Sequence, residues 1–117
     1  MKKYSWDDNK YSLTEIIEKV KPKSYKSARN SDRIGHAYNL IEWNKVNNYL
    51  DIGCETGRFL DYVHHYNSDI KLTGVDCNQS SIDIANDVFG DKDIHFELIK
   101  TDNKLPFENN TFSLVTF

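Results

Sequence analysis

The chain has 117 residues, of which 38% are hydrophobic, and this is enough for one domain with a buried core but excludes two domains or a disordered chain. Its net charge of −3 excludes an overall electrostatic field that would attract nucleic acid. No apolar run approaches the roughly 18 residues that a membrane span needs, so we expect a soluble globular domain with no membrane partner.

The N-terminal segment is predicted to form a helix and then a basic linker. Ser12 and Glu15 have the spacing of a capping box, in which each side chain accepts a hydrogen bond from the other residue's backbone, and apolar positions of a helix over 12–20 follow. Pro22 ends this helix. Residues 21–33 then carry five Lys or Arg side chains without an apolar period, which is typical of a solvated linker. The alternative is that these cations steer a phosphate-bearing acceptor.

From Ser31 onward the pattern alternates between helices and strands. Ser31 is predicted to cap a helix that stops at Asn47–Asn48, and a strand, a helix, a strand, a helix and two strands follow. Their predicted ranges are 49–52, 56–66, 72–76, 78–89, 94–99 and 112–117. This alternation predicts an α/β domain over residues 31–117 with a mainly parallel sheet, because parallel neighbours need crossover connections. The helix and linker form a separate region over 1–30.

The stretch from Tyr49 to Leu60 carries the most informative motif. Asp51 ends a strand, Gly53 and Gly57 form a tight turn, and a helix starts at once. Glycine in such a turn lets the backbone adopt a positive φ and lets a ligand approach closely, while the helix N-terminus offers unpaired N–H groups. A small-molecule site is therefore predicted. The alternative is a plain strand-to-helix turn.

Two further acidic residues are predicted at the same edge of the sheet. Asp76 ends the next strand, roughly 20 residues after the glycine turn, where an acid can accept hydrogen bonds from both hydroxyls of a ribose. Asp102 follows the third strand. Because the carboxyl ends of parallel strands meet at one edge, Asp51, Asp76 and Asp102 should line one rim. The alternatives are that Asp76 caps the helix beginning near Asn78 and that Asp102 and Asn103 are turn residues.

Together these residues resemble the N-terminal, cofactor-binding half of a class I methyltransferase that uses S-adenosylmethionine. The matching pattern is Asp51-x-Gly53-x-x-x-Gly57, Asp76, and Asp102 followed by Leu105-Pro106-Phe107 and a hydrophobic strand. The resemblance covers the chain from about residue 31 to its end. It implies a Rossmann-like, mainly parallel sheet with flanking helices, in which the first four strands lie in the order 3-2-1-4 and the fold is cut after the fourth.

The resemblance also implies roles for individual residues. Asp76 would bind the ribose hydroxyls, Cys77 would border the adenine, and Asp102 with the backbone of Asn103 would contact the adenine edge. The loop residues that would hold the amino-acid end of S-adenosylmethionine are Asp51, Gly53, Cys54, Glu55 and Gly57. Glu55 departs from the family, which usually has a third glycine there, and its side chain would crowd the methionine moiety or demand an unfavourable backbone angle.

The implied activity is transfer of a methyl group to an acceptor that the sequence does not identify, and no general base is named. Family domains have about seven strands, so a fragment of a longer enzyme is expected. The alternative is a truncated, non-catalytic module that acts through self-association or a partner chain at the apolar edge strand 112–117. A nicotinamide-dinucleotide site is a further alternative, although Gly53-x-x-x-Gly57 is not the Gly-x-Gly-x-x-Gly pattern of such sites.

The cysteines and histidines predict little further chemistry. Cys54 and Cys77 are too few for a disulfide scaffold and lack the paired spacing of a zinc site, which favours a reducing, cytoplasmic compartment. His64 and His65 have no third ligand at metal spacing, so a solvated helix face is predicted instead of a metal site. His95 alternates with apolar residues and is predicted to be packed or paired.

Overall fold

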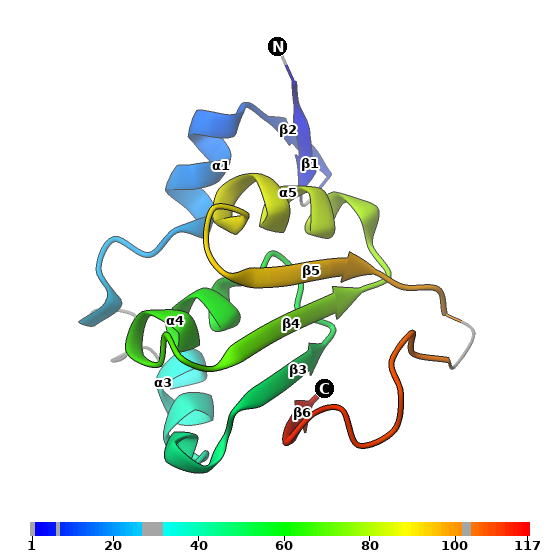
Figure 1. Cartoon of the computed structure of the whole chain (residues 1–117). Coiled ribbons are helices and arrows are strands. Elements are labelled where there is room, and N and C mark those ends of the chain that lie inside the picture. Colours follow the sequence, from blue (N-terminus) through cyan, green and yellow to red (C-terminus); the bar gives the residue numbers. More distant parts are fainter. Residues whose placement is uncertain (1, 7, 27–31, 102–103) are drawn as a thin grey trace.

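The computed structural model describes residues 2–6, 8–26, 32–101 and 104–117, and a four-stranded sheet lies at its centre (Figure 1). The strands are β3 (Asn48–Ile52), β4 (Lys71–Asp76), β5 (Ile94–Leu98) and β6 (Leu114–Thr116). They lie in the order β5-β4-β3-β6, and every neighbouring pair is parallel. This is the predicted order 3-2-1-4, so the predicted Rossmann-like α/β fold is confirmed.

Two helices pack on one face of the sheet. Helix α4 (Arg58–Tyr66) follows β3, and α5 (Gln79–Phe89) follows β4. The register aligns Tyr49, Leu72 and Ile94 in one row across β3, β4 and β5, and all three side chains are buried in the core. The predicted apolar stripe of α5, which includes Ile82 and Phe89, is buried against this face as expected from its helical spacing.

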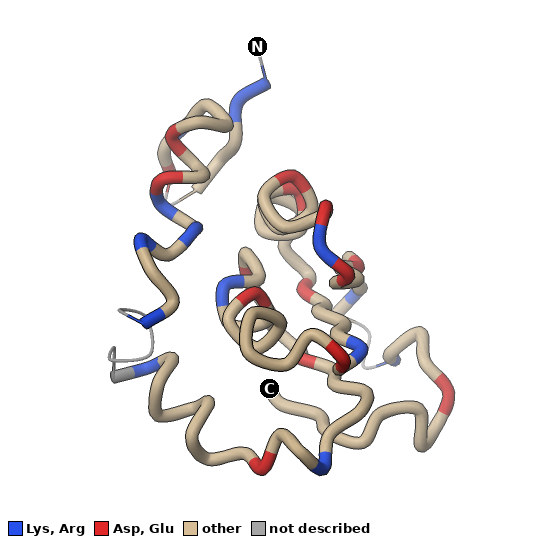
Figure 2. The backbone as a smooth tube through the Cα atoms, turned by 60° about the vertical axis from the view of Figure 1, so that its left-hand side comes forward, with Lys and Arg blue, Asp and Glu red and all other residues tan. Residues whose placement is uncertain are grey.

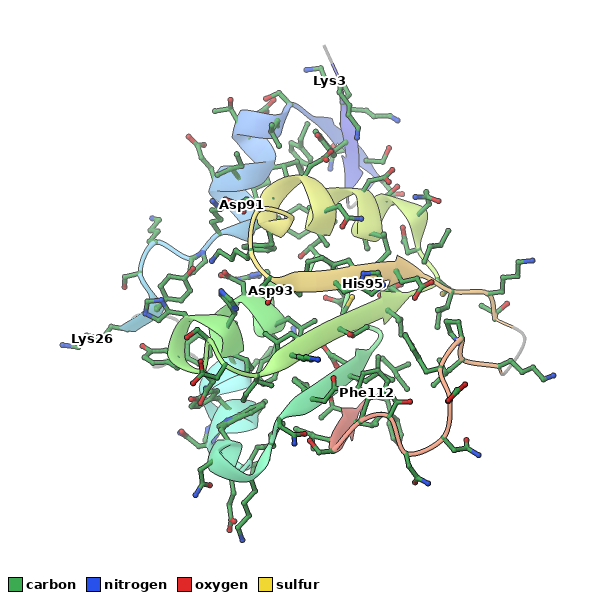
Figure 3. The ribbon with its side chains drawn as sticks, in the orientation of Figure 1. Lys3, Lys26, Asp91, Asp93, His95 and Phe112 are labelled. Carbon is green, nitrogen blue, oxygen red and sulfur yellow. The ribbon has the colours of Figure 1, made fainter. Side chains whose placement is uncertain are left out.

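The other face of the sheet is more open at its two edge strands. His95 of β5 points away from the helices, and its imidazole lies 3.5 Å from the Glu97 carboxylate (Figure 3). The His95 side chain is 64% exposed, so of the two predicted alternatives, packed or paired, the structure shows a histidine paired at the surface. Val115 of β6 is 44% exposed.

The N-terminal segment forms more structure than the sequence pattern indicated. Strands β1 (Tyr4–Trp6) and β2 (Asn9–Tyr11) form an antiparallel hairpin that was not predicted. Helix α1 (Leu13–Val20) follows with the predicted capping box, in which Glu15 N donates to Ser12 Oγ and Ser12 N donates to Glu15 Oε1. The hairpin and α1 lie against the outer side of α5, where the hydroxyl of Tyr4 donates to Asp87 Oδ2 at 2.6 Å.

Tyr25 corrects the prediction of a wholly solvated linker. The lysines of the segment after α1 are exposed, as expected. Figure 2 marks their positions along the backbone. Tyr25, however, stacks on His65 of α4 with ring centroids 3.7 Å apart, and its hydroxyl donates to Asp61 Oδ1. Lys92 forms an ion pair with the same Asp61 oxygen. The Asp61 side chain is fully buried, so these two partners stabilise a carboxylate that would otherwise be costly to bury.

The helix predicted from Ser31 to Asn47 is shorter than expected. Helix α3 (Asp32–Asn39) ends early, and a short 3-10 helix, η1 (Trp43–Lys45), leads into β3. Trp43 is buried and its indole N–H donates to the carbonyl of Tyr38 at 2.9 Å. This side-chain contact turns the chain where local periodicity favoured a continued helix. No helix in the described parts of the chain is long and apolar enough to cross a membrane.

Gly53 and Gly57 provide a test of how tightly the loop after β3 is packed. Both have positive φ, but a Cβ at Gly53 would meet no atom within 4 Å, whereas a Cβ at Gly57 would lie 2.6 Å from Phe96 Cζ. We expect Gly53→Ala to lower the free energy of unfolding by about 1 kcal/mol through backbone strain alone. Gly57→Ala should lower it by about 3 kcal/mol, because overlap with the buried ring adds to the strain. Urea unfolding measures both, and equal losses would contradict this packing.

Candidate functional site

The loop between β3 and α4 is fixed across the carboxyl ends of two parallel strands. The backbone N–H groups of Gly53 and Cys54 both donate to the carbonyl of Val75 in β4, at 2.8 and 3.0 Å. Gly53 has φ +79°, Glu55 has φ +54° and Gly57, the N-cap of α4, has φ +85°. The loop therefore has a left-handed backbone at three positions, one of which is not glycine. The unfavourable backbone angle predicted for Glu55 is confirmed.

Asp76 connects this loop to the start of α5. Its Oδ2 accepts a hydrogen bond from Glu55 N and its Oδ1 accepts one from Asn78 N, both at 2.9 Å. The N-cap of α5 is Asn78, whose side chain accepts from Ser81 N, so Asp76 is not the helix cap. Each carboxylate oxygen has two lone pairs, so both oxygens of Asp76 can accept a further hydrogen bond from a ligand.

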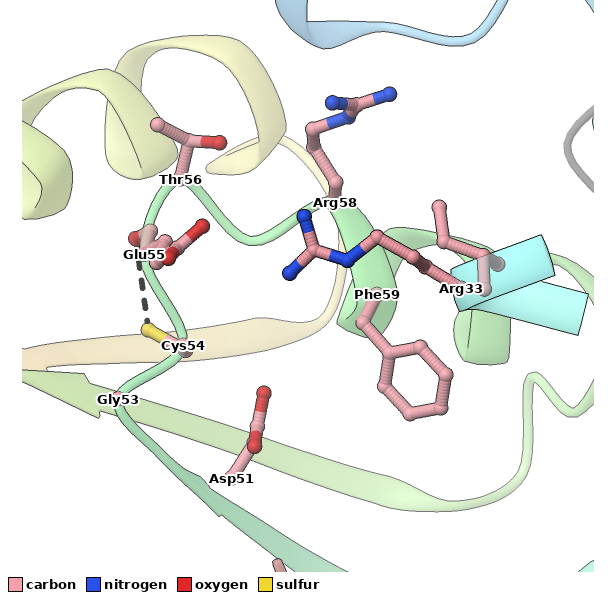
Figure 4. A pocket seen from close by; sticks show the side chains of 9 residues that line it. Arg33, Asp51, Gly53, Cys54, Glu55, Thr56, Arg58 and Phe59 are labelled. Carbon is pink, nitrogen blue, oxygen red and sulfur yellow. Dashed lines mark hydrogen bonds between the residues drawn. The ribbon is translucent and has the colours of Figure 1, made fainter. Parts of the chain in front are cut away.

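A cavity of about 490 Å³ opens in front of the loop (Figure 4). This volume lies within the range of roughly 300–1,000 Å³ that small-molecule sites occupy. The cavity is lined by Arg33, Ile34, Asp51, Gly53, Cys54, Glu55, Thr56, Arg58 and Phe59. Its walls thus come from α3, the end of β3, the loop and the first turn of α4.

The structure brings most of the described candidate residues to this place. Four of them line the cavity, and these are Asp51, Gly53, Cys54 and Glu55. Gly57 lies next to the lining residue Thr56 and packs on Phe96, and Asp76 reaches the cavity wall through its hydrogen bond with Glu55. Cys77 is exposed and is not a lining residue. Asp102 and Asn103 lie outside the described residues, so the predicted rim of three acids is described for Asp51 and Asp76 alone.

Asp51 is the most buried acid of the cavity wall. Burial raises the pKa of Asp51 above its usual value, and the nearby negative charges of Glu55 and Asp76 raise it further. The hydroxyl of Thr116 donates to Asp51 Oδ1 at 2.8 Å and opposes this rise, because the hydrogen bond favours the ionised form. A cation in the cavity would relieve the repulsion among the three carboxylates.

Cys54 is a chemically quiet member of the lining. Burial raises the pKa of its thiol to about 12, and the charge of Asp51 contributes. The thiol therefore stays protonated near neutral pH and is a poor nucleophile. Among the described residues, no group of three or more metal-ligating side chains comes together.

Two arginines of the cavity were not recognised from the sequence as site residues. In the sequence, Arg33 is one of the cations of the predicted linker, and Arg58 stands directly after the glycine turn. Figure 4 shows Arg33 reaching from α3 into the space bordered by Glu55 and Asp51, with Arg58 beside it. Neither guanidinium forms an ion pair within the described part of the chain. The sequence did carry a signal for Arg58. A cation at the first position of a helix is unfavourable because it lies at the positive end of the helix dipole, and residues that break such local rules are concentrated at functional sites.

Comparison with known proteins decides the family. Residues 50–117 match the family model described as a methyltransferase domain. The chain belongs to the methyltransferase domain family. A curated relative, carboxy-S-adenosyl-L-methionine synthase from Campylobacter hominis, is 34% identical over 85 residues, which are 72% of this chain and 35% of the relative. The chain thus spans about a third of the length of the curated relative it matches.

Solved structures of similar proteins share the methyltransferase domain's fold. The PH0226 protein from Pyrococcus horikoshii OT3 has a TM-score of 0.62 at 23% identity, over 80% of this chain and 42% of that one. The plantazolicin methyltransferase BpumL, in a complex with a triazolic desmethylPZN analogue and SAH, has a TM-score of 0.55 at 19% identity, over 88% of this chain and 38% of that one. At these identities the likeness concerns the fold.

Replacing Glu55 tests whether the cavity loop is strained. Glu55→Gly should raise the free energy of unfolding by about 1 kcal/mol relative to Glu55→Ala, because alanine keeps the cost of a left-handed backbone and glycine does not. Both variants remove the carboxylate, so its repulsion with Asp51 cancels in the comparison. Urea unfolding of the two variants measures the difference. Equal stabilities would show that the loop carries no strain at this residue.

Proposed function

We propose that this chain is the cofactor-binding part of a methyltransferase that transfers a methyl group from S-adenosylmethionine to an acceptor. The observation that carries the proposal is the charge arrangement of the cavity, in which acidic and basic side chains border one space beside a glycine loop. The family match over residues 50–117 supports the reaction class. The separate 85-residue alignment with the curated relative covers 35% of that protein, which supports the view that the cofactor-binding part belongs to a longer enzyme.

The charges of the cavity suit the amino-acid end of S-adenosylmethionine, which carries an ammonium and a carboxylate group. Asp51 and Glu55 offer carboxylates for the ammonium, and Arg33 offers a planar guanidinium that can bind a carboxylate through two hydrogen bonds. Open space next to the Gly53 backbone lets a ligand approach the loop closely. The residues present therefore fit the cofactor.

The adenosine part is assigned to the end of β4. Asp76 has acceptor capacity left on both carboxylate oxygens after binding the loop and the start of α5, and we assign these to the ribose hydroxyls. The exposed position of Cys77 supports its assignment beside the adenine. Asp102 and Asn103 are assigned to the adenine edge on the family resemblance.

When bound, S-adenosylmethionine supplies an electrophilic methyl group on its sulfonium. The chain's own residues bind and orient it, and methyl transfer depends chiefly on such positioning of the methyl donor against the acceptor. The protonated thiol of Cys54 suits this role, because a thiolate in the cavity wall would compete as a nucleophile.

We assign the two regions of the chain different roles. Residues 31–117 bind the cofactor, and residues 1–30 support them, because α1 packs on α5 and Tyr25 contacts α4. Both cysteines are free thiols, which supports the assignment of the protein to the reducing cytoplasm.

Calorimetric titration with S-adenosylhomocysteine and with NAD tests the proposed cofactor. S-adenosylhomocysteine should bind and NAD should not, and Asp76→Ala should abolish binding because it removes the ribose acceptor and the support of the loop. Binding of NAD alone would favour the dinucleotide alternative. Binding of neither ligand would overturn the proposal.

Arg33→Ala separates recognition of the amino-acid end from recognition of adenosine. It should weaken S-adenosylhomocysteine at least about tenfold, since a charged hydrogen-bonded pair is lost. The affinity for 5′-methylthioadenosine, which lacks the amino-acid end, should change by less than about twofold. Lys45→Ala removes an exposed cation that does not line the cavity and serves as the control. Equal effects of Arg33→Ala on both ligands would contradict the charge assignment.

A second candidate role, self-association through residues 112–117, is favoured by exposed apolar side chains. Val115 of edge strand β6 is 44% exposed and Phe117 is fully exposed. We expect the chain to form dimers in sedimentation velocity as its concentration rises, and we expect Val115→Lys to reduce them because a charge on an edge strand opposes pairing. His95→Lys on the opposite edge strand is the control. A monomer at all concentrations, or equal effects of both variants, would refute this role.

A further inference from the structure

Thr116 connects the edge strand β6 to the acid of the cavity loop. The parallel register places Thr116 opposite Asp51 and Leu114 opposite Tyr49, so these side chains project from the same face of the sheet. The Thr116 hydroxyl lies 2.8 Å from Asp51 Oδ1 and 2.5 Å from the hydroxyl of Tyr49. A continuous chain of hydrogen bonds thus connects the buried Tyr49 of β3, through Thr116 of β6, to Asp51 at the cavity.

The direction of this chain of hydrogen bonds follows from the number of protons. A threonine hydroxyl has one proton, and an ionised carboxylate only accepts. The proton of Thr116 is therefore directed at Asp51, and the hydroxyl of Tyr49 donates to Thr116. Tyr49 is fully buried, and burial raises the pKa of its phenol above the ordinary value, so Tyr49 keeps its proton and remains the donor.

We propose that Thr116 is a positioning residue whose hydroxyl, oriented by Tyr49, holds the Asp51 carboxylate toward the ammonium group of the bound ligand. Recognition of the ammonium group then depends on the pairing of β6 with β3. This inference rests on the proposed function of the cavity. Thr116 does not line the cavity, so it acts on the ligand through Asp51.

The electrostatic surroundings of Asp51 make the Thr116 hydroxyl important. Burial and the charges of Glu55 and Asp76 raise the pKa of Asp51, and the hydrogen bond from Thr116 lowers it. Among the described residues, the charged or titratable side chains that the structure places around Asp51 are Tyr49 of β3, Cys54 and Glu55 of the loop, Asp76 of β4, Arg33 of α3 and Arg58 of α4. Without the Thr116 hydroxyl, Asp51 should accept a proton at a higher pH and lose its attraction for an ammonium group.

The test compares Thr116→Val, which keeps the shape and removes the hydroxyl, with Thr116→Ser, which keeps the hydroxyl. The probes are S-adenosylhomocysteine and 5′-methylthioadenosine, which lacks the ammonium group. Thr116→Val should lower the affinity for S-adenosylhomocysteine at least about tenfold and the affinity for 5′-methylthioadenosine less than about twofold. The Thr116→Ser variant should bind both probes with the affinities of the parent chain. In Thr116→Val the affinity for S-adenosylhomocysteine should fall at a higher pH than in the parent as the solution is acidified.

Two further measurements keep this inference separate from folding and from the proposed function. The double variant Tyr49→Phe/Thr116→Val removes both hydroxyls, so no buried donor is left unpaired, and it should show the same selective loss. Carbon-detected NMR of the unliganded chain should show a higher pKa for Asp51 in Thr116→Val than in Thr116→Ser, even if neither probe binds. An unchanged Asp51 pKa, or equal losses of both probes, would overturn the role of Thr116.

Discussion

The candidate site depends on one backbone arrangement, the pair of hydrogen bonds that the carbonyl of Val75 accepts from Gly53 and Cys54. These bonds extend the parallel pairing of β3 and β4 past the end of β3 and into the loop. The loop therefore takes its position from the sheet and not from its own side chains. Asp76, the next residue of β4, adds a third bond to the loop at Glu55 and a fourth to the start of α5. One strand end thus fixes both the loop and the helix beside it.

Close packing beneath the loop explains one glycine at its end, Gly57, and a second glycine, Gly74, in the neighbouring strand β4. A Cβ at Gly57 would overlap the ring of Phe96, and a Cβ at Gly74 would lie within 3 Å of Leu60 and Cys54. The N-terminus of α4 can therefore approach the sheet only because these positions lack side chains. This approach directs the first turn of α4, with Arg58, at the cavity. Packing in the core and the shape of the site share the same steric constraint.

The parts of the fold that could be predicted from the sequence are those set by local pattern and by chain topology. Alternating strands and helices, together with the requirement for crossover connections, were enough to predict a mainly parallel α/β sheet, and the resemblance to class I methyltransferases implied the order of its four strands. The capping box of Ser12 and Glu15 is likewise local. The hairpin of β1 and β2 was missed because its strands are three residues long, and a distant contact between Tyr4 and Asp87 helps to hold it in place. No local pattern reports such a contact.

The same distinction separates the two halves of the cavity wall. Asp51, Gly53 and Glu55 lie in one continuous stretch whose spacing is readable, whereas Arg33 enters from α3 and depends on tertiary contacts. Those contacts are between aromatic rings. Tyr38 of α3 packs edge-on against Tyr62 of α4 and stacks on Trp43. The Trp43 ring in turn lies against Tyr49 and Phe59. Aromatic pairs of this kind add roughly 0.5–1.5 kcal/mol each beyond the burial of their surface. The acidic residues of the cavity wall, Asp51 and Glu55, are therefore positioned by the backbone of the sheet, whereas Arg33 is positioned by side-chain packing. A ligand that contacts both the acidic residues and Arg33 would connect these two parts of the fold.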